Sequence, residues 1–356
     1  MIDPLFWKDR KVFITGHTGF KGGWLSHWLK NLGAHVYGYA LPPNEEQSFF
    51  SKTLVSDSLF SNTFSDIRNL DAFKKAMQLA EPSIVIHLAA QPLVIDSYLD
   101  PISTYSTNVM GVVNMFESVR SCASVKAVLN VTTDKCYENK EQLEGYQEND
   151  PMGGYDPYSS SKGCSELVSS SYRKSFFHDS GIALATARAG NVIGGGDWAK
   201  NRIIPDAMNA FANNEKLLIR NPNSIRPWQH VLEPLIGYIV LCQQLINQPE
   251  KFSGAWNFGP NNEDTQPVSM LADIIAESWG DSAEWEHDNG EHPHEANYLK
   301  LDCSKANNIL KWKSIWTLDQ ALVETVKWYK AFYNNENMSK FTLKQIEKYI
   351  SNETTS

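Results

Sequence analysis

A short apolar run followed at once by a glycine-rich turn constrains the fold of this chain more than any other feature. Lys11–Thr15 (KVFIT) leads into Gly16–Gly22 (GHTGFKG), and helical spacing then continues over Phe20–Leu32. Gly16 would allow a tight turn, Gly19 would let the backbone approach a diphosphate, and Gly22 would let the helix pack close to the strand. The free N–H groups of the helix would then face an anion. The pattern predicts a strand, a phosphate-binding turn and a helix, with a glycine-rich turn without a ligand as the alternative.

Apolar runs and helical patterns alternate through the first half of the chain. Continuous apolar strands separated by helices predict a parallel sheet that is covered on both faces. The fold class expected is therefore α/β, a doubly wound Rossmann sheet. Further strands are expected at His35–Ala40, Ser83–Leu88, Ala127–Val131 and Ala183–Arg188, and helices at Asp71–Leu79 and Ser103–Ser118.

Glycine and proline become more frequent after Gly190, which indicates that a second domain begins there. A chain of 356 residues suits two domains. Residues 1–190 are expected to form the nucleotide-binding Rossmann domain, and residues 191–356 to form mainly a smaller α/β domain for the substrate, with some later elements returning to the first. Helices are expected at Ile203–Asn213, Glu233–Ile246, Met270–Ser278, Asp319–Asn334 and Thr342–Ile350.

Composition excludes several classes of function. The net charge of −9 is unfavourable for a nucleic-acid surface or a polybasic membrane patch. No apolar run reaches the length of about 18 residues that spans a bilayer. The five cysteines are scattered without CxxC spacing, which favours reduced thiols and a cytoplasmic location. His287, His292 and His294 are interpreted as part of a solvated loop, and no metal site is expected.

Tyr158 and Lys162 are four residues apart, which places both on one face of a helix. A phenol has a pKa of about 10 and is a weak base near neutrality. A nearby ammonium group, together with a positive nicotinamide ring, favours the phenolate, which can take a proton from a hydroxyl as hydride leaves its carbon. The pattern is common by chance, and its position after the strand Ala127–Val131 is what makes it informative.

Together these pieces resemble the extended short-chain dehydrogenase/reductase family. The resemblance covers roughly Lys11 to Trp328 and implies a bound NAD, a nucleotide-sugar substrate, and a homodimer or homotetramer. It also implies a structural role for Asn108. The cofactor contacts it implies are Gly16, Thr18, Gly19, Phe20, Lys21, Gly22, Asp66, Ile67, Leu88, Ala89, Ala90, Thr107, Thr132, Tyr158 and Lys162.

The acidic residue that usually follows the second strand of an NAD-binding Rossmann fold is missing. The strand His35–Ala40 continues into Leu41-Pro42, and no carboxylate occurs before Glu45. That carboxylate normally binds the adenine ribose. No arginine occurs there to receive a 2′-phosphate, so NAD is favoured over NADP.

Thr133-Asp134-Lys135 distinguishes the branches of the family. In nucleotide-sugar 4,6-dehydratases this stretch usually ends in Glu, and the version with Lys resembles the branch that acts on CDP-glucose. The resemblance implies that Thr133 bonds the C4 oxygen beside Tyr158, while a protonated Asp134 donates to the leaving C6 hydroxyl. Lys135 is the candidate base for the C5 proton. Alternatively, Lys135 orients a water or stabilises the enolate, because a free lysine has a pKa of about 10.4. A further alternative is that Asp134 and Lys135 form only an ion pair in a loop.

Asn191, Arg202 and Arg226 are the candidate substrate-binding residues. The family segments that they match contact the sugar and grip the diphosphate, and an arginine fork suits phosphate oxygens. Trp198 and Trp228 either stack on the base or pack between domains, and packing is favoured for Trp228. The alternatives for the whole chain are another nucleotide-sugar 4,6-dehydratase, a nucleotide-sugar 4-epimerase, and a non-catalytic NAD sensor.

Overall fold

The large sheet of the computed structural model has seven parallel strands in the order β10-β6-β5-β4-β1-β2-β3. The structure describes residues 2–43, 47–199, 202–280, 283–288, 290 and 299–353. The strand order reverses between β1 and β4, which places a ligand crevice at their carboxyl ends. This sheet confirms the predicted fold class. Its strands are β1 (Lys11–Thr15), β2 (His35–Ala40), β3 (Ser61–Phe64), β4 (Ile84–His87), β5 (Ala127–Val131), β6 (Ala183–Ala189) and β10 (Gly254–Phe258).

Both edge strands of this sheet were absent from the expectations. β3 reads SNTF and has three exposed residues out of four, so it lacks the apolar run of a buried strand. β10 pairs with β6 in parallel although it follows β6 by more than 60 residues, from Gly254 against Ala185 to Phe258 against Ala189. The second half of the chain therefore completes the sheet of the first.

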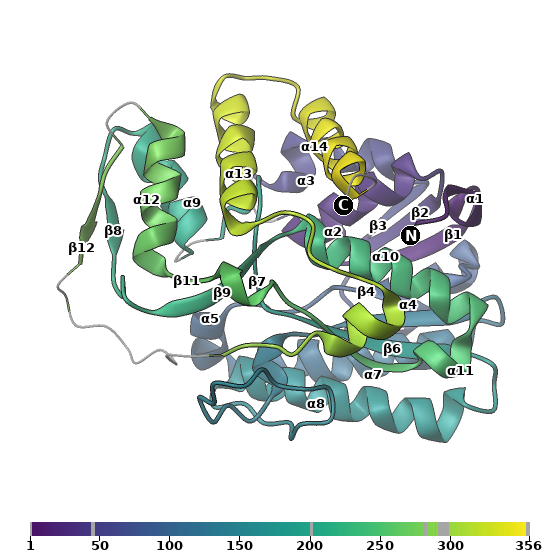
Figure 1. Cartoon of the computed structure of the whole chain (residues 1–356). Coiled ribbons are helices and arrows are strands. Elements are labelled where there is room, and N and C mark those ends of the chain that lie inside the picture. Colours follow the sequence, from purple (N-terminus) through teal and green to yellow (C-terminus); the bar gives the residue numbers. More distant parts are fainter. Residues whose placement is uncertain are drawn as a thin grey trace.

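Helices cover both faces of the sheet. Side chains alternate between the two faces along each buried strand, so one strand contributes to two cores. Val12 and Ile14 of β1 belong to the core beneath α2 and α10, whereas Phe13 belongs to the core beneath α4 and α7. Figure 1 shows α7 and α8 on one side of the sheet and α2 and α10 on the other. The helices are α1 (Pro4–Trp7), α2 (Phe20–Asn31), α3 (Phe49–Lys52), α4 (Leu70–Ala80), α5 (Val94–Leu99), α6 (Pro101–Tyr105), α7 (Gly111–Arg120), α8 (Pro157–Tyr172), α9 (Ile203–Ala212), α10 (Leu232–Asn247), α11 (Pro249–Phe252), α12 (Val268–Trp279), α13 (Leu318–Tyr333) and α14 (Met338–Glu353).

Two small sheets lie beyond the end of β6. β7 (Asn191–Ile193) follows β6 directly and pairs with β9 (Ile225–His230), which also pairs with β11 (Thr265–Pro267). β8 (Leu217–Ile219) pairs with β12 (Trp285–His287). These strands and helices α9 and α12 all come from residues after 190, whereas α10 packs on β5 and β6, and α14 packs on α2. The division at residue 190 stays a prediction.

In the part of the chain that the structure describes, no helix is both long and apolar enough to cross a membrane. All five cysteines are free.

Candidate active site

The turn between β1 and α2 has room for glycine only at two of its positions. Gly16 adopts a φ of +77°, and a Cβ there would lie 2.8 Å from the backbone nitrogen of Ala89. A Cβ on Gly22 would lie 2.2 Å from the carbonyl oxygen of Gly16. Gly19 is the N-cap of α2 and supplies no side-chain cap, so the first N–H groups of that helix are not bound by a cap. The turn thus has the close packing and the uncapped helix end that suit a diphosphate.

Thr15 joins the ends of β1 and β4 at the point where the strand order reverses. Its hydroxyl accepts hydrogen bonds from the backbone N–H groups of Leu88 and Ala89, both at 3.1 Å. It also shares a hydrogen bond of 2.8 Å with Nδ1 of His87. Burial lowers the pKa of His87 to about 3, so this ring is neutral. These contacts fix the segment Leu88-Ala89-Ala90 beside the glycine turn.

Thr18, Asp66 and Ile67, which are predicted to contact the cofactor, have different surroundings in the structure. The Thr18 hydroxyl donates to the carbonyl of Leu41 at 3.0 Å, next to the end of β2. Asp66 accepts hydrogen bonds from Arg68 through both carboxylate oxygens, with a shortest distance of 2.6 Å. Ile67 is buried in the core beneath α4 and α7. Glu45, the first carboxylate after the second strand, lies outside the described residues.

Thr133, Asp134 and Lys135 follow β5 and begin a 3-10 turn that spans Asp134–Cys136. The Thr133 hydroxyl donates to Asp134 Oδ1 at 2.9 Å and accepts the backbone N–H of Lys135 at 3.4 Å. Burial raises the pKa of Asp134, although Lys135 and the Thr133 hydrogen bond act in the opposite direction. A carboxyl group in this setting is suited to hold a proton and donate it. Lys135 is half-buried.

Tyr158 and Lys162 lie in the first two turns of α8, which begins with Asp156 as its N-cap. Both side chains are buried. Burial raises the pKa of Tyr158 to about 12, while a hydrogen bond with Thr133 and the charge of Arg202 lower it. Burial lowers the pKa of Lys162 to about 8, and Glu166 acts in the opposite direction. The structure therefore brings the tyrosine on α8 into contact with the threonine that follows β5.

Asn108 links the cofactor side of the sheet to α8, as its implied structural role requires. Its amide donates to the carbonyl of Gln91 at 3.0 Å and to the Ser161 hydroxyl at 2.9 Å, and its Oδ1 accepts the N–H of Gln91 at 2.8 Å. Asn108 lies in a π-helical turn, Ser106–Met110, which also contains the half-buried Thr107.

A cationic cluster surrounds the catalytic candidates. Arg202 donates to Asp197 at 2.8 Å. The pKa of Lys21 is lowered to about 8, first by burial and then by the neighbouring charges of Arg202 and Lys162. Lys21 is thus close enough to Arg202, Lys162 and Asp134 for the charge of each to affect its pKa. Asp197 was not among the predicted residues, and no motif in the sequence pointed to it.

Asn191 and Arg226 lie on adjacent strands of the small sheet, where Asn191 of β7 pairs with Trp228 of β9. Trp198 packs against Trp328, Tyr329 and Phe332, which favours the packing interpretation for this residue. Trp228 is half-buried and packs on the same core. His287 is exposed on β12, and His292 and His294 lie outside the described residues.

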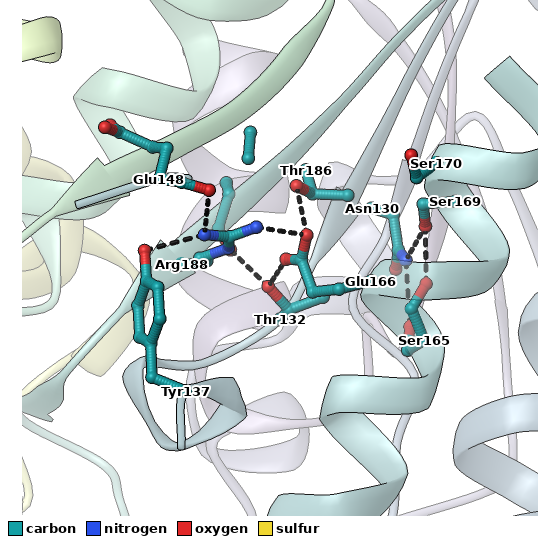
Figure 2. A network of polar contacts seen from close by, with 12 residues as sticks. Asn130, Thr132, Tyr137, Glu148, Ser165, Glu166, Ser169, Ser170, Thr186 and Arg188 are labelled. Atoms are coloured by element: carbon teal, nitrogen blue, oxygen red, sulfur yellow. Dashed lines mark hydrogen bonds and ion pairs between the residues drawn. The ribbon is translucent and has the colours of Figure 1, made fainter. Parts of the chain in front are cut away.

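A second group of polar residues lies behind the site, and only Thr132 among its members was predicted from the sequence. Glu166 on α8 binds Thr132, Thr186 and Arg188, all of them buried (Figure 2). Glu166 follows Lys162 by four residues, and this helical spacing is the signal in the sequence that points to it.

The model of the protein family described as GDP-mannose 4,6 dehydratase matches residues 13–325. The chain belongs to this family. Within it, the chain is 53% identical over 356 residues to a CDP-glucose 4,6-dehydratase of Salmonella typhimurium, with 99% of each sequence covered. It is 25% identical over 338 residues to a probable dTDP-glucose 4,6-dehydratase of Sinorhizobium fredii, covering 90% of this chain and 92% of that one.

Solved structures show the same fold at lower identity. A dTDP-glucose 4,6-dehydratase from Bacillus anthracis, in complex with NAD, matches with a TM-score of 0.75 at 20% identity, over 94% of this chain and 99% of that chain. A UDP-glucose-4-epimerase from Stenotrophomonas maltophila, with NAD bound, matches with a TM-score of 0.80 at 18% identity, over 91% of this chain and 99% of that chain. The shared fold extends over more than nine-tenths of this chain in both cases.

Proposed function

We propose that this member of the family dehydrates CDP-D-glucose to CDP-4-dehydro-6-deoxy-D-glucose, using NAD, in deoxysugar synthesis for O-antigen polysaccharide. One observation carries the proposal. Thr133-Asp134-Lys135 lies beside Tyr158 and Lys162 in a chain that is 53% identical to a CDP-glucose 4,6-dehydratase. The net reaction is the loss of one water, which makes the protein a hydro-lyase.

NAD fits the residues around the glycine turn. Gly16 and Gly22 permit a backbone turn that no side chain would allow, and the uncapped end of α2 suits the diphosphate. The remaining contacts are proposed from Thr18, Phe20, Asp66, Ile67, the Leu88-Ala89-Ala90 segment, Thr107 and Thr132. When bound, NAD would accept hydride from C4 of the sugar and return it at C6. Lys162, one turn beyond Tyr158, would hold the nicotinamide ribose.

Tyr158 would take the proton of the C4 hydroxyl, with the Thr133 hydroxyl bound to the same oxygen. Since burial raises the pKa of Tyr158 to about 12, the phenolate depends on nearby positive charge. Arg202 supplies such charge in the structure, and Lys162 lies on the same helix face. Tyr158 is thus a general base that is hydrogen-bonded to the Thr133 hydroxyl and lies near the charge of Arg202.

Asp134 and Lys135 would carry out the loss of water. Asp134, whose pKa is raised by burial, would protonate the C6 hydroxyl as it leaves. Lys135 would remove the C5 proton, which the C4 ketone has made acidic. In the alternative role Lys135 stabilises the enolate, and another base takes the proton. Arg202, Arg226 and Asn191 would hold the sugar nucleotide.

The rival functions predict different products. A 4-epimerase has no use for Asp134 as an acid that expels water. A non-catalytic NAD sensor has no need of Thr133, Tyr158 and Lys162 together. The test is to offer the purified protein CDP-, dTDP-, UDP- and GDP-sugars and to measure product mass. We expect loss of one water from CDP-glucose. Product from dTDP-glucose alone would overturn the choice of nucleotide, and a simple epimer would overturn dehydration.

A homodimer or homotetramer is part of the proposal. Large apolar side chains are exposed along α5, α6 and α8, including Leu99, Ile102 and Leu167, which are between 60% and 82% exposed. Such side chains on neighbouring helices mark surfaces that associate. Light scattering of the purified protein should give a dimer or tetramer, and a Leu99→Asp/Ile102→Asp variant should be a monomer. The free cysteines support a cytoplasmic location.

A further inference from the structure

Glu166 lies on α8 one turn beyond Lys162, and the residue is only 5% exposed. Oε1 accepts the Thr132 hydroxyl at 2.5 Å. Oε2 accepts the Thr186 hydroxyl at 2.8 Å and Arg188 Nη2 at 2.8 Å. A buried carboxylate with three donors and a counter-charge is held in one position.

Arg188 on β6 extends these contacts to the far side of the catalytic segment. Its Nη1 donates to the Tyr137 hydroxyl at 2.6 Å and to the carbonyl of Glu148 at 3.0 Å. Tyr137 in turn donates to Asn257 of β10 at 2.8 Å. Figure 2 shows the arginine between the carboxylate and the tyrosine.

The two ends of this chain of contacts flank the catalytic segment. Thr132 comes directly before Thr133, and Tyr137 comes directly after the 3-10 turn Asp134–Cys136. Nearby, Asn130 of β5 donates to the Ser165 and Ser169 hydroxyls of α8 at 3.0 and 2.9 Å. The strand that leads into the catalytic segment is thus held against the helix that carries Tyr158.

We propose that Glu166 and Arg188 are positioning residues: they hold Thr133-Asp134-Lys135 at both flanks and so set its place relative to Tyr158 and Lys162. The inference rests on the proposed function, because only that function requires the acid, the base and the hydroxyl to act on three adjacent carbons of one sugar. A displacement of about 1 Å at such a site can lower a rate about 100-fold.

A matched pair of variants separates positioning from structural support. Thr132→Val and Thr186→Val each remove one buried hydroxyl that donates to Glu166, and both keep the side-chain shape. Thr132 adjoins the catalytic segment in the sequence, whereas Thr186 lies on β6, away from that segment in the sequence. We expect both variants to lose similar stability in urea unfolding. Only Thr132→Val should lower kcat, by about 10- to 100-fold, with KM for the sugar nucleotide within about twofold of wild type.

Two outcomes would overturn the proposal. Equal kcat for the two variants would show that Glu166 only supports the fold. A Thr132→Val enzyme with normal kcat at saturating NAD but weaker NAD binding, measured by fluorescence titration, would show that Thr132 serves the cofactor alone. The comparison uses whichever nucleotide sugar the wild type converts. If the proposed substrate is wrong, the wild-type enzyme will fail to convert CDP-glucose. If the positioning proposal is wrong, the wild type will still convert its substrate, and the two variants will not differ in kcat.

The role of the Glu166–Arg188 ion pair is tested with a double variant. Glu166→Gln alone would leave Arg188 as a buried unpaired charge and could unfold the protein. Glu166→Gln/Arg188→Met removes both charges and keeps the volume. We expect it to fold and to retain KM, with kcat lowered by at least about tenfold. A folded double variant with wild-type kcat would overturn the role of the pair.

Discussion

Arg202 Nη1 donates to Asp197 Oδ2 at 2.8 Å, and the charge of the same guanidinium group lowers the pKa of Tyr158. Asp197 is nearly buried, so the arginine is directed by a carboxylate that cannot easily move. One side chain therefore connects the proposed diphosphate contact to the proposed base.

Replacing Arg202 should affect binding and pH dependence together. We expect Arg202→Met to raise KM for CDP-glucose about 10- to 100-fold, since a hydrogen bond to a charged group contributes about 1.5–3 kcal/mol. Loss of the positive charge also raises the pKa of Tyr158 further, so the acidic limb of the kcat profile should move to higher pH. Arg202→Lys keeps the charge but loses the planar guanidinium group that binds two phosphate oxygens at once. This variant should restore the pH profile while KM stays high. An unchanged KM in Arg202→Met would contradict the binding role.

Asp134→Asn should separate oxidation from dehydration. The amide cannot protonate the leaving hydroxyl, whereas Tyr158 and Thr133 can still act on the C4 hydroxyl. We expect water loss to slow about 100- to 10,000-fold, with reduced nicotinamide accumulating in absorbance measurements. In wild type, this step should slow as the pH rises through the pKa of Asp134, which burial has raised. If the variant fails to reduce NAD at all, Asp134 acts before dehydration.

Lys135 can be tested through exchange of the C5 hydrogen with solvent deuterium. If Lys135 is the base, Lys135→Ala should reduce NAD but show no exchange at C5, measured by mass spectrometry. If Lys135 only stabilises the enolate, exchange should continue at a lower rate. Dehydration at nearly the wild-type rate would remove Lys135 from the mechanism.

We expect the buried charge of Lys162 to lower the free energy of unfolding, although the side chain supports catalysis. Burial lowers its pKa in the folded state to about 8, from the ordinary lysine value of 10.5. Below pH 8 the folded protein must keep a buried charge, so Lys162→Met should be more stable there, by at most about 3 kcal/mol. The gain should shrink as the pH rises from 8 to 10.5, where the folded lysine is neutral and the unfolded one still charged. Urea unfolding at several pH values measures this difference, and a gain independent of pH would contradict it. Activity should be nearly absent in the variant.

The groups facing Lys162 come from several elements. Glu166 on the same helix and Cys136 after β5 raise its pKa, while Lys21 on α2 and His87 on β4 lie close enough for their own pKa values to be lowered by its charge. Since His87 is neutral, Lys21 is the cation among these neighbours, and Lys21→Met should shift the pKa of Lys162 upward. Activity in wild type should therefore fall above about pH 8, and at a higher pH in Lys21→Met.

The glycine turn offers a matched test of cofactor binding. A Cβ on Gly22 would lie 2.2 Å from the Gly16 carbonyl, whereas the nearest atom to a Cβ on Gly19 is that same oxygen at 3.4 Å. Gly22→Ala should therefore lower stability by several kcal/mol. Gly19→Ala should fold normally but bind NAD more weakly, because the methyl group projects where the diphosphate must approach. Calorimetry with NAD compares the two, and normal NAD affinity in Gly19→Ala would contradict this.

Local sequence patterns predicted the central strands and most helices, because buried parallel strands and amphipathic helices have distinct periods. They did not predict β3, whose exposed polar residues resemble a loop, or β10, whose partner β6 is far away in the sequence. The site was anticipated where residues are adjacent or one helical turn apart, as with Thr133-Asp134-Lys135 and Tyr158 with Lys162. Pairs across elements, such as Glu166 with Arg188 and Arg202 with Asp197, depend on strand order and register. Neither can be read from local periodicity.

The late arrival of β10 has a consequence for biosynthesis. Until residue 247 has left the ribosome, the apolar surface that α10 covers on β5 and β6 would remain in water, and until residue 258 has left it, β6 would be an open sheet edge. A nascent chain that already contains every catalytic candidate would thus be prone to aggregation. We expect a truncated gene product ending at residue 190 to need chaperone assistance and to be degraded, although it would encode the whole glycine turn and both catalytic segments.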